Sequence, residues 1–201
     1  MKRIFDIIIS FLALILLTPF FILISTLIVI FMGRPIFFIQ ERVGKNCKIF
    51  RIFKFRTMNV SKSKKIDTRY DKSRTTKLGQ FLRNYSLDEL PEFINVLNGS
   101  MSLVGPRPLL VEYLSIYTDE QNRRHLIKPG ITGMAQINGR NLLSWDETFQ
   151  YDLYYVDNNN LLLDIKILLA TVKKFFLKEG IDESHNKTKE KLSFKKDKKD
   201  L

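Results

Sequence analysis

An uninterrupted apolar run near the N-terminus constrains this chain more than any other feature. From Ile7 to Met32 there are 26 consecutive residues without a charge, whereas about 20 apolar residues are enough to cross a bilayer. The apolar region of a cleaved signal peptide is shorter, roughly 7–15 residues, and small residues follow it. Here the run is bulky throughout and is followed by Arg34. We therefore exclude a signal peptide and predict a membrane segment over residues 1–33.

Two topologies remain open for this segment. A straight spanning helix is the simplest interpretation of the hydropathy. The alternative is a re-entrant helix broken at Thr18 and Pro19, because Pro19 removes the hydrogen bond to the carbonyl of Ile15. The hydroxyl of Thr18 can satisfy such a freed backbone group. Basic residues flank both ends of the run and favour the cytoplasmic side, so we favour the monotopic, re-entrant form with both ends on the cytoplasmic face.

Composition limits the partners and the kinds of site. The 201 residues carry a formal net charge of +12, which points to nucleic acid, anionic lipid or phosphate-bearing substrates. With 45% hydrophobic residues the chain can bury a core. Cys47 is the only cysteine, so an intramolecular disulfide is excluded. His125 and His185 are far apart and lack cysteine partners at metal spacing, which argues against a structural zinc site.

Local patterns predict an α+β, mainly helical chain with a short β-hairpin. The apolar strands Ile36–Gln40 and Lys48–Phe55 flank a turn at Arg42–Asn46. Four helices are expected, at Lys77–Tyr85, Pro91–Leu97, Leu109–Tyr117 and Leu161–Lys178. A polar loop is predicted over Asn59–Thr76, and shaped loops over Lys128–Gly133 and Ile137–Arg140, where turn residues are dense.

The last predicted helix and the tail complete the domain organisation. The helix Leu161–Lys178 has a wide apolar surface and four lysines. It either packs into the core or lies at the membrane interface with its lysines toward lipid phosphates. Seven lysines lie between Lys187 and Leu201, and we expect this tail to be disordered. The predicted units are a membrane helix at 1–33, a small helical domain with interfacial amphipathic helices at 34–180, and a basic tail at 181–201.

The acidic pair Asp88 and Glu89 is the first candidate for chemistry. Ser86 and Glu89 have the spacing of a capping box, which would assign these side chains to a helix N-terminus. The same place also suits an anion, because helix N-terminal amides stabilise phosphate. Two adjacent carboxylates can divide the roles of nucleophile, metal ligand and base. Both interpretations place the pair near the start of a helix.

Basic residues elsewhere are candidates for binding phosphate. Arg107 lies between two prolines, so its restrained backbone lowers the entropic cost of gripping a phosphate. Arg140 follows an Asn-Gly turn and is read in the same way. Lys54 and Arg56 alternate with phenylalanines on the second predicted strand. Such a surface can stack on RNA, but no recognised nucleic-acid motif accompanies it, and we favour a strand beside the membrane.

Five blocks in order resemble a known family. They are the apolar N-terminus with Pro19, Lys54-Phe-Arg-Thr-Met58, Ser86-Leu-Asp-Glu-Leu-Pro91, Val104-Gly-Pro-Arg-Pro108 and Pro129-Gly-Ile-Thr-Gly133. From about Lys2 to Lys174 the chain resembles the bacterial sugar transferase family, within the monotopic phosphoglycosyl transferase superfamily. Because nothing precedes the re-entrant segment, it looks like the small PglC-type members. Met134 stands where the family often has tryptophan, and Thr18 where it often has serine.

The resemblance implies an activity at the bacterial plasma membrane. A sugar 1-phosphate would pass from a UDP-sugar to undecaprenyl phosphate, with release of UMP. Asp88 would be the nucleophile and a ligand of Mg²⁺, and Glu89 would position or deprotonate the lipid phosphate. Arg107 and Arg140 would hold phosphates, with Lys54, Arg56 and Arg83 as further candidates. These seven residues are the predicted site.

The donor and the final product stay open. The resemblance to PglC-type members implies UDP-N,N′-diacetylbacillosamine and N-linked glycoprotein biosynthesis, with membrane phospholipid and later glycosyltransferases as further partners and no nucleic acid. A sister enzyme would use UDP-galactose, UDP-glucose or UDP-N-acetylglucosamine for capsule, O-antigen or exopolysaccharide. The alternative from another class is a membrane-tethered basic binding protein without catalysis, which predicts no UMP release with any UDP-sugar.

Overall fold

The computed structural model describes residues 1–59, 74–177 and 192, and these residues form the predicted mainly helical α+β fold. The α-helices are α1 (Lys2–Met32), α3 (Lys77–Asn84), α4 (Glu92–Leu97), α5 (Asp119–Asn122), α6 (Met134–Asn138), α7 (Trp145–Asn158) and α8 (Leu161–Leu177). Short 3-10 turns are η1 (Lys45–Cys47), η3 (Leu87–Glu89), η4 (Val111–Ile116), η5 (Arg123–Leu126) and η6 (Arg140–Leu142). The strands are β1 (Phe37–Val43), β2 (Ile49–Phe55), β3 (Ser102–Val104) and β4 (Gly130–Thr132).

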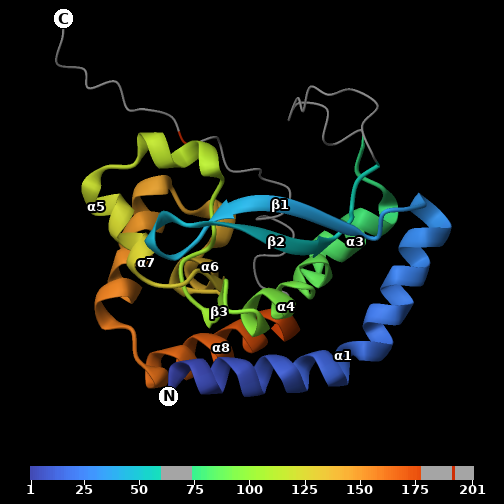
Figure 1. Cartoon of the computed structure of the whole chain (residues 1–201), viewed down its shortest axis with the longest axis horizontal. Helices are drawn as coiled ribbons and strands as arrows, with labels where there is room; N and C mark the ends of the chain where they lie inside the picture. Colours follow the sequence, from blue (N-terminus) through green and yellow to red (C-terminus); the bar gives the residue numbers. More distant parts are fainter. Residues whose placement is uncertain (60–73, 178–191, 193–201) are drawn as a thin grey trace, which may run out of the picture.

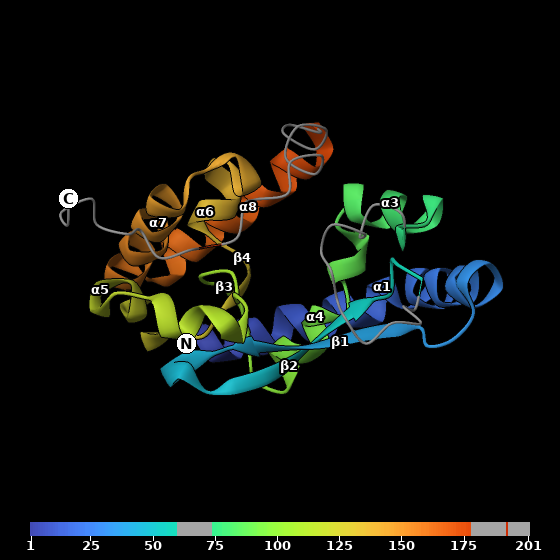
Figure 2. The same ribbon diagram turned by 90° about the horizontal axis from the view of Figure 1, so that it is seen from above.

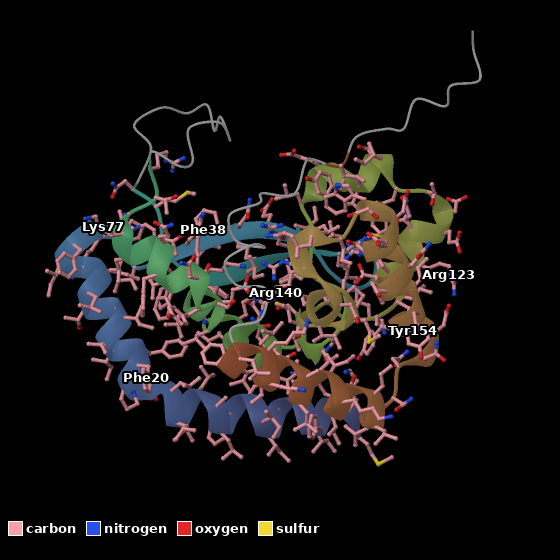
Figure 3. The ribbon with its side chains drawn as sticks, turned by 180° about the vertical axis from the view of Figure 1, so that it is seen from behind. Phe20, Phe38, Lys77, Arg123, Arg140 and Tyr154 are labelled. Carbon is pink, nitrogen blue, oxygen red and sulfur yellow. The ribbon has the colours of Figure 1, made fainter. Side chains whose placement is uncertain are left out.

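The apolar helix α1 is continuous but bent. Figure 1 shows a first arm along one edge of the molecule and a second arm that turns up toward α3, and Phe20 lies at the corner (Figure 3). Pro19 lies inside the helix at this point. The hydroxyl of Thr18 donates to the carbonyl of Leu14 across 2.8 Å, not to the carbonyl of Ile15 that Pro19 leaves free. The predicted break is therefore a bend within one helix.

The first arm of α1 is fixed to the rest of the fold by its charged start. The ammonium of Lys2 lies 2.5 Å from Oδ2 of Asp164 and 3.2 Å from the carbonyl of Val104. Arg3 donates to the carbonyls of Val96 and Leu97, across 2.6 and 2.9 Å, at the end of α4. Lys2 and Arg3 are basic residues that flank the apolar run, and both thus have partners within the protein.

The second arm of α1 packs against the hairpin and α3. Ile24 and Ile28 are buried together with Phe55 of β2 and Leu82 of α3. Most of the helix surface is nevertheless exposed, since only 11% of its most apolar 18-residue window is buried. By length and composition α1 is able to cross a membrane. Its apolar exterior is what a lipid environment would cover.

The predicted hairpin is present with a longer first strand. β1 and β2 pair antiparallel, with Phe37 opposite Phe55 and Val43 opposite Ile49. The first strand was expected to end at Gln40, but it continues three residues further because the turn is confined to Gly44 and η1. Two consecutive residues there, Asn46 and Cys47, have positive φ, so the reversal is tight.

The core lies around a parallel pair of short strands that the local patterns did not predict. β3 and β4 pair with Ser102 opposite Gly130 and Val104 opposite Thr132. The expected loops over residues 128–140 therefore contain β4 and α6. The main cluster of buried apolar side chains is Ile52, Val96, Met101, Leu103, Val104, Tyr155 and Ile167. In Figure 2 the hairpin lies on one side of this core and α6, α7 and α8 lie on the other.

Helix α8 has one row of side chains in the core and other apolar side chains that are exposed. Ile167 is buried in the core, while Leu162, Leu169 and Val172 on the same helix are exposed. Figures 1 and 3 show α8 and the first arm of α1 along the same edge of the molecule. An apolar surface that faces away from the core at this edge is consistent with an interfacial helix.

The remaining predicted elements have mixed outcomes. The helices predicted at Lys77–Tyr85 and Pro91–Leu97 are confirmed as α3 and α4. The one predicted at Leu109–Tyr117 is the 3-10 segment η4. Helix α7 was not predicted. Residues 60–73 of the predicted polar loop lie outside the described residues, as does the predicted disordered tail apart from Leu192.

Candidate active site

The acidic pair lies on a short 3-10 turn between two helices. Asp88 and Glu89 belong to η3, which links α3 to α4. Ser86 precedes them in the left-handed conformation, with φ of 52°, and its side chain makes no capping hydrogen bond. The interpretation of Ser86 and Glu89 as a capping box, one of the two left open by the sequence, is therefore wrong. The carboxylate of Glu89 is directed instead at two cations.

Glu89 is held between Lys54 and Arg107. Its Oε1 lies 2.6 Å from the ammonium of Lys54 and 2.6 Å from NH2 of Arg107. Burial opposes the charge on Glu89, but the two cations outweigh it and hold the pKa of this carboxyl well below its ordinary value. Glu89 is thus an ionised carboxylate at neutral pH, with an oxygen shared between two donors.

Asp88 differs from its neighbour. Burial, followed by the negative charge of Glu89, raises the pKa of Asp88 to about 6, while Lys54, Arg83 and Arg107 counteract the rise. At pH 7 the group is still mainly ionised. A partly buried carboxylate whose ionised form is disfavoured by its surroundings is well suited to attack an electrophile.

A further carboxylate, the buried Glu92, lies beside Lys54. Its Oε1 lies 3.1 Å from the ammonium, and its side chain is 2% exposed. Burial raises the pKa of Glu92 to about 7 in spite of Lys54. Glu89 and Glu92 in turn outweigh the effect of burial on Lys54 and raise the pKa of this lysine. Sequence analysis missed Glu92. The available signal was its spacing of one helical turn after Asp88, which puts two side chains on the same side of a helix start.

Arg107 reaches the acidic pair from the loop that follows β3. NH2 and NH1 lie 2.6 and 3.4 Å from the two carboxylate oxygens of Glu89. The charge of Glu89 raises the pKa of Arg107, and 46% of its side chain is exposed. Arg107, the residue predicted to bind phosphate, is therefore at the site. Its side chain is charged and accessible, and its partner is a carboxylate.

Arg140 and Arg83 lie around the same centre. Arg140 begins η6 with φ of 55°, and Figure 3 shows it in the middle of the molecule. Burial lowers its pKa, and the charges of Glu89 and Arg107 act on it. Arg83 donates from Nε to the hydroxyl of Thr57 across 2.9 Å, and its charge acts on Asp88. Four of the predicted basic residues, Lys54, Arg83, Arg107 and Arg140, thus lie around Asp88 and Glu89 and come from separate segments.

Arg56 does not belong to this group. Its NH2 donates to the carbonyls of Met32 and Gly33, across 2.7 and 2.6 Å, and its NH1 to that of Arg34 across 3.1 Å. The side chain is buried at the end of α1. It satisfies carbonyls that a helix C-terminus leaves without partners. The predicted phosphate-binding role of Arg56 is not supported by this placement.

The close approach of α3 to the strand exit helps to shape the site. A Cβ on Gly79 would lie 1.8 Å from the carbonyl oxygen of Thr57. Only glycine allows α3 to lie this near the backbone that follows β2. This contact brings Arg83 next to Thr57 and sets the position from which η3 begins.

Comparison with known proteins now assigns the family. Residues 1–178 match the family described as bacterial sugar transferase. The chain belongs to this family. The prediction drawn from the five sequence blocks is confirmed, and so is the prediction that the protein is an enzyme.

Three relatives of this sugar transferase illustrate its breadth. It is 45% identical over 193 residues to the uncharacterized sugar transferase EpsL of Bacillus subtilis, with 96% of both chains covered. It is 42% identical to the UDP-glucose:undecaprenyl-phosphate glucose-1-phosphate transferase of Klebsiella pneumoniae, covering 89% of this chain and 41% of that one. It is 36% identical to the undecaprenyl-phosphate galactose phosphotransferase of Salmonella typhimurium, covering 90% and 41%. The chain spans about two-fifths of the length of the last two relatives.

Proposed function

We propose that this protein transfers a sugar 1-phosphate from a UDP-sugar to undecaprenyl phosphate and releases UMP. The observation that carries the proposal is the pair of unlike carboxylates, Asp88 and Glu89, beside Lys54 and Arg107. A diphosphate and a lipid phosphate are both anionic, and the cations around the acidic pair would offset their repulsion. The names of the Klebsiella and Salmonella relatives support the same acceptor.

The proposed reaction has two displacements at phosphorus. In the first, a carboxylate oxygen of Asp88 attacks the β-phosphorus of the donor, and the bond to the oxygen that bridges the two phosphates breaks. UMP leaves with the bond electrons, and the sugar phosphate remains on Asp88. In the second, a phosphate oxygen of the lipid attacks the same phosphorus, and the carboxylate of Asp88 is released.

The surrounding side chains divide the remaining work. Arg107, with Arg140 beside it, would bind the phosphate oxygens and stabilise the charge that develops on them. Glu89 is ionised and would orient the incoming lipid phosphate or take its proton. Lys54 lies between Glu89 and Glu92. Its positive charge would therefore stay beside Glu89 while Arg107 exchanges the Glu89 carboxylate for a substrate phosphate.

Mg²⁺ stays the predicted cofactor. Within residues 1–59 and 74–177 no group of three or more histidine, cysteine, aspartate or glutamate side chains could hold a metal ion. Mg²⁺ commonly takes only one or two protein carboxylates and completes its shell with substrate phosphates and water. Asp88 would be that carboxylate, and the ion would neutralise charge on the diphosphate.

The identity of the donor sugar separates two versions of the proposal. UDP-N,N′-diacetylbacillosamine and glycoprotein biosynthesis stay a prediction from the resemblance. The relatives named for glucose and galactose transfer, and those named for exopolysaccharide production, favour the alternative of UDP-glucose or UDP-galactose. We expect the protein to lie on the cytoplasmic face of the plasma membrane, because UDP-sugars are soluble and the lipid phosphate lies at headgroup level.

The test is UMP release by the purified chain in nanodiscs that contain undecaprenyl phosphate. Each UDP-sugar is supplied in turn with Mg²⁺, and Asp88→Asn is the matched variant. Release by the parent and its loss in the variant support the proposal, and labelling of the parent by donor without acceptor supports the covalent step. No UMP from any donor would favour the non-catalytic alternative. Undiminished turnover in excess chelator would remove Mg²⁺ from the proposal.

A further inference from the structure

The buried ion pair of Arg124 and Asp152 has no role in the reaction described above. Both side chains are almost fully buried, with 1% and 2% exposed. Oδ2 of Asp152 accepts from NH2 and Nε of Arg124 across 2.6 and 3.1 Å. The guanidinium carbon also lies over the ring of Phe149, 5.7 Å from the ring centre. The pair joins η5 to α7 in the interior.

A buried ion pair is a costly way to join two helices, because desolvation cancels most of the attraction. The same two elements already share a second pair, Arg123 with Asp157, and both of those side chains are about half exposed. The two arginines are neighbours on η5, and the two carboxylates belong to α7. Holding η5 against α7 therefore does not by itself explain why one pair is buried.

Arg124, unlike Arg123, also bonds the loop that carries Arg107. Its NH2 donates to the backbone carbonyl of Arg107 across 2.8 Å. Arg107 lies between Pro106 and Pro108, which have no N–H with which to anchor the loop. The planar guanidinium bonds Asp152 and the carbonyl of Arg107 with one rigid group. The carbonyls of Pro106 and Pro108 accept from the backbone N–H of Gly130 and from NH1 of Arg42, across 3.0 and 3.4 Å. The carbonyl of Arg107 between them is bonded from α7, through Arg124.

The contacts form a continuous path from α7 to the acidic pair. Asp152 accepts a hydrogen bond from Arg124, and Arg124 donates another to the carbonyl of Arg107. The Arg107 side chain in turn bonds Glu89 across 2.6 Å. We propose that Arg124, oriented by Asp152, is a positioning residue that places Arg107 for the phosphate groups of the substrates. The link to substrate rests on the proposed function, whereas the link to the Arg107 loop does not.

The first arm of the experiment measures the loop without catalysis. Hydrogen exchange of the full chain in nanodiscs is followed by mass spectrometry in peptides that cover residues 103–110. Arg124→Lys keeps the charge but lacks the planar group that bonds Asp152 and Arg107 together. We expect faster exchange in these peptides, and no change with the matched control Arg123→Lys. Unchanged exchange with Arg124→Lys would overturn the positioning role.

The second arm measures coupling to Arg107. Arg124→Lys should lower kcat/KM for the donor by roughly 10- to 100-fold, since a misplacement of about 1 Å can cost 10²-fold. In an Arg107→Lys background the same change should have an effect several-fold smaller, because residues in one network are not additive. Equal effects in both backgrounds would indicate a purely structural role and overturn the proposal.

Two provisions keep the outcome decisive. If Arg124→Lys does not fold, Asp152→Glu replaces it, because the longer side chain keeps the charge and shifts the anchor by one methylene group. Should the parent release no UMP with any donor, the proposed function fails, while the exchange measurement still decides whether Arg124 fixes the Arg107 loop. The two failures are therefore distinguishable.

Discussion

The guanidinium of Arg107 lies 2.6 Å from Oε1 of Glu89, so the arginine predicted to hold a phosphate has a carboxylate as its partner in the structure. Binding of a phosphate would have to compete with this pair. Glu89 would keep Lys54, which lies equally close to the same oxygen. The arrangement allows Arg107 to exchange partners without leaving the partly buried carboxylate of Glu89 uncompensated.

The first prediction concerns this exchange. Arg107→Lys keeps a positive charge but loses the planar, bidentate geometry that matches phosphate. We expect kcat/KM for the donor to fall by about 10- to 100-fold, since a charge-assisted bidentate contact contributes about 1.5–3 kcal/mol. Thermal stability should change little, because 46% of the side chain is exposed. Arg123→Lys is the control. Equal kcat/KM in parent and variant would contradict a bidentate role.

The second prediction follows from the pKa of Asp88, which burial and then Glu89 raise to about 6. The nucleophile must be ionised, so kcat/KM should fall as the pH drops through about 6, or through a lower value where Mg²⁺ stabilises the carboxylate. Arg83 opposes the rise in this pKa. Arg83→Gln should therefore move the acid limb to higher pH, by up to about 1 unit. A pH–rate profile with Arg123→Gln alongside checks the shift, and an unmoved limb would count against it.

The third prediction concerns stability and Glu92, whose pKa burial raises to about 7 from an ordinary 4.5. Between these values the unfolded chain binds fewer protons than the folded one, so this group lowers stability as the pH rises through the window. Glu92→Gln removes the effect and leaves Lys54 paired with Glu89. We expect the variant to be more stable than the parent at pH 8, by up to about 3 kcal/mol, and equal to it near pH 4. Equal melting curves at pH 8 would refute this.

Local sequence patterns predicted those helices and strands whose structure depends mainly on their own residues. The hairpin, α3 and α4 follow from strand alternation, turn residues and short apolar periods, and α8 from its length. Helix α7 was missed although Ser144 and Glu147 form a capping box. The same spacing misled at Ser86, where the side chain makes no cap. The spacing of serine and glutamate cannot distinguish these cases. Which group the glutamate bonds depends on the other segments that pack against it in the folded protein.

Site residues that belong to a sequence motif could be predicted. Residues whose role depends on burial in the folded protein could not. Asp88, Glu89 and Arg107 came from blocks that resemble the family. Glu92 and Arg124 look like ordinary surface residues in the sequence, and their importance arises from tertiary packing that places them at 2% exposure. The parallel pairing of β3 with β4 joins segments about 28 residues apart, and local periodicity contains no information about such a contact.

The fourth prediction concerns the attachment of α1 to the core. Asp6 is buried and accepts from the hydroxyl of Ser102 and the backbone N–H of Leu103, across 2.9 and 3.2 Å. Asp6→Ala would leave two buried donors without a partner, at a cost of about 1–3 kcal/mol. We expect a lower midpoint of thermal unfolding, and no change for the exposed control Asp157→Ala. A variant as stable as the parent would show that β3 does not depend on α1.

The last prediction concerns topology, because both ends of α1 are fastened to one folded unit. Lys2 is bonded to Asp164 near the start of the helix, and Arg56 bonds the carbonyls of Met32 and Gly33 at its end. A straight helix of 31 residues would separate these ends by roughly 46 Å and could not make both sets of contacts. We therefore predict that α1 enters and leaves the membrane on the same side, with the bend at Pro19 as its deepest part.

Cysteine labelling of intact bacteria tests this topology. A single cysteine is inserted after Met1 in a Cys47→Ser variant, and Cys47, which is exposed on η1, reports the other end in the parent. With a membrane-impermeant reagent both should be protected until the cells are permeabilised. Combining Pro19→Ala with Asp6→Ala restores the backbone hydrogen bond at the bend and weakens the attachment of the first arm, so the inserted cysteine should then become labelled from outside. Labelling of that cysteine without these changes would establish a spanning helix and refute the re-entrant form.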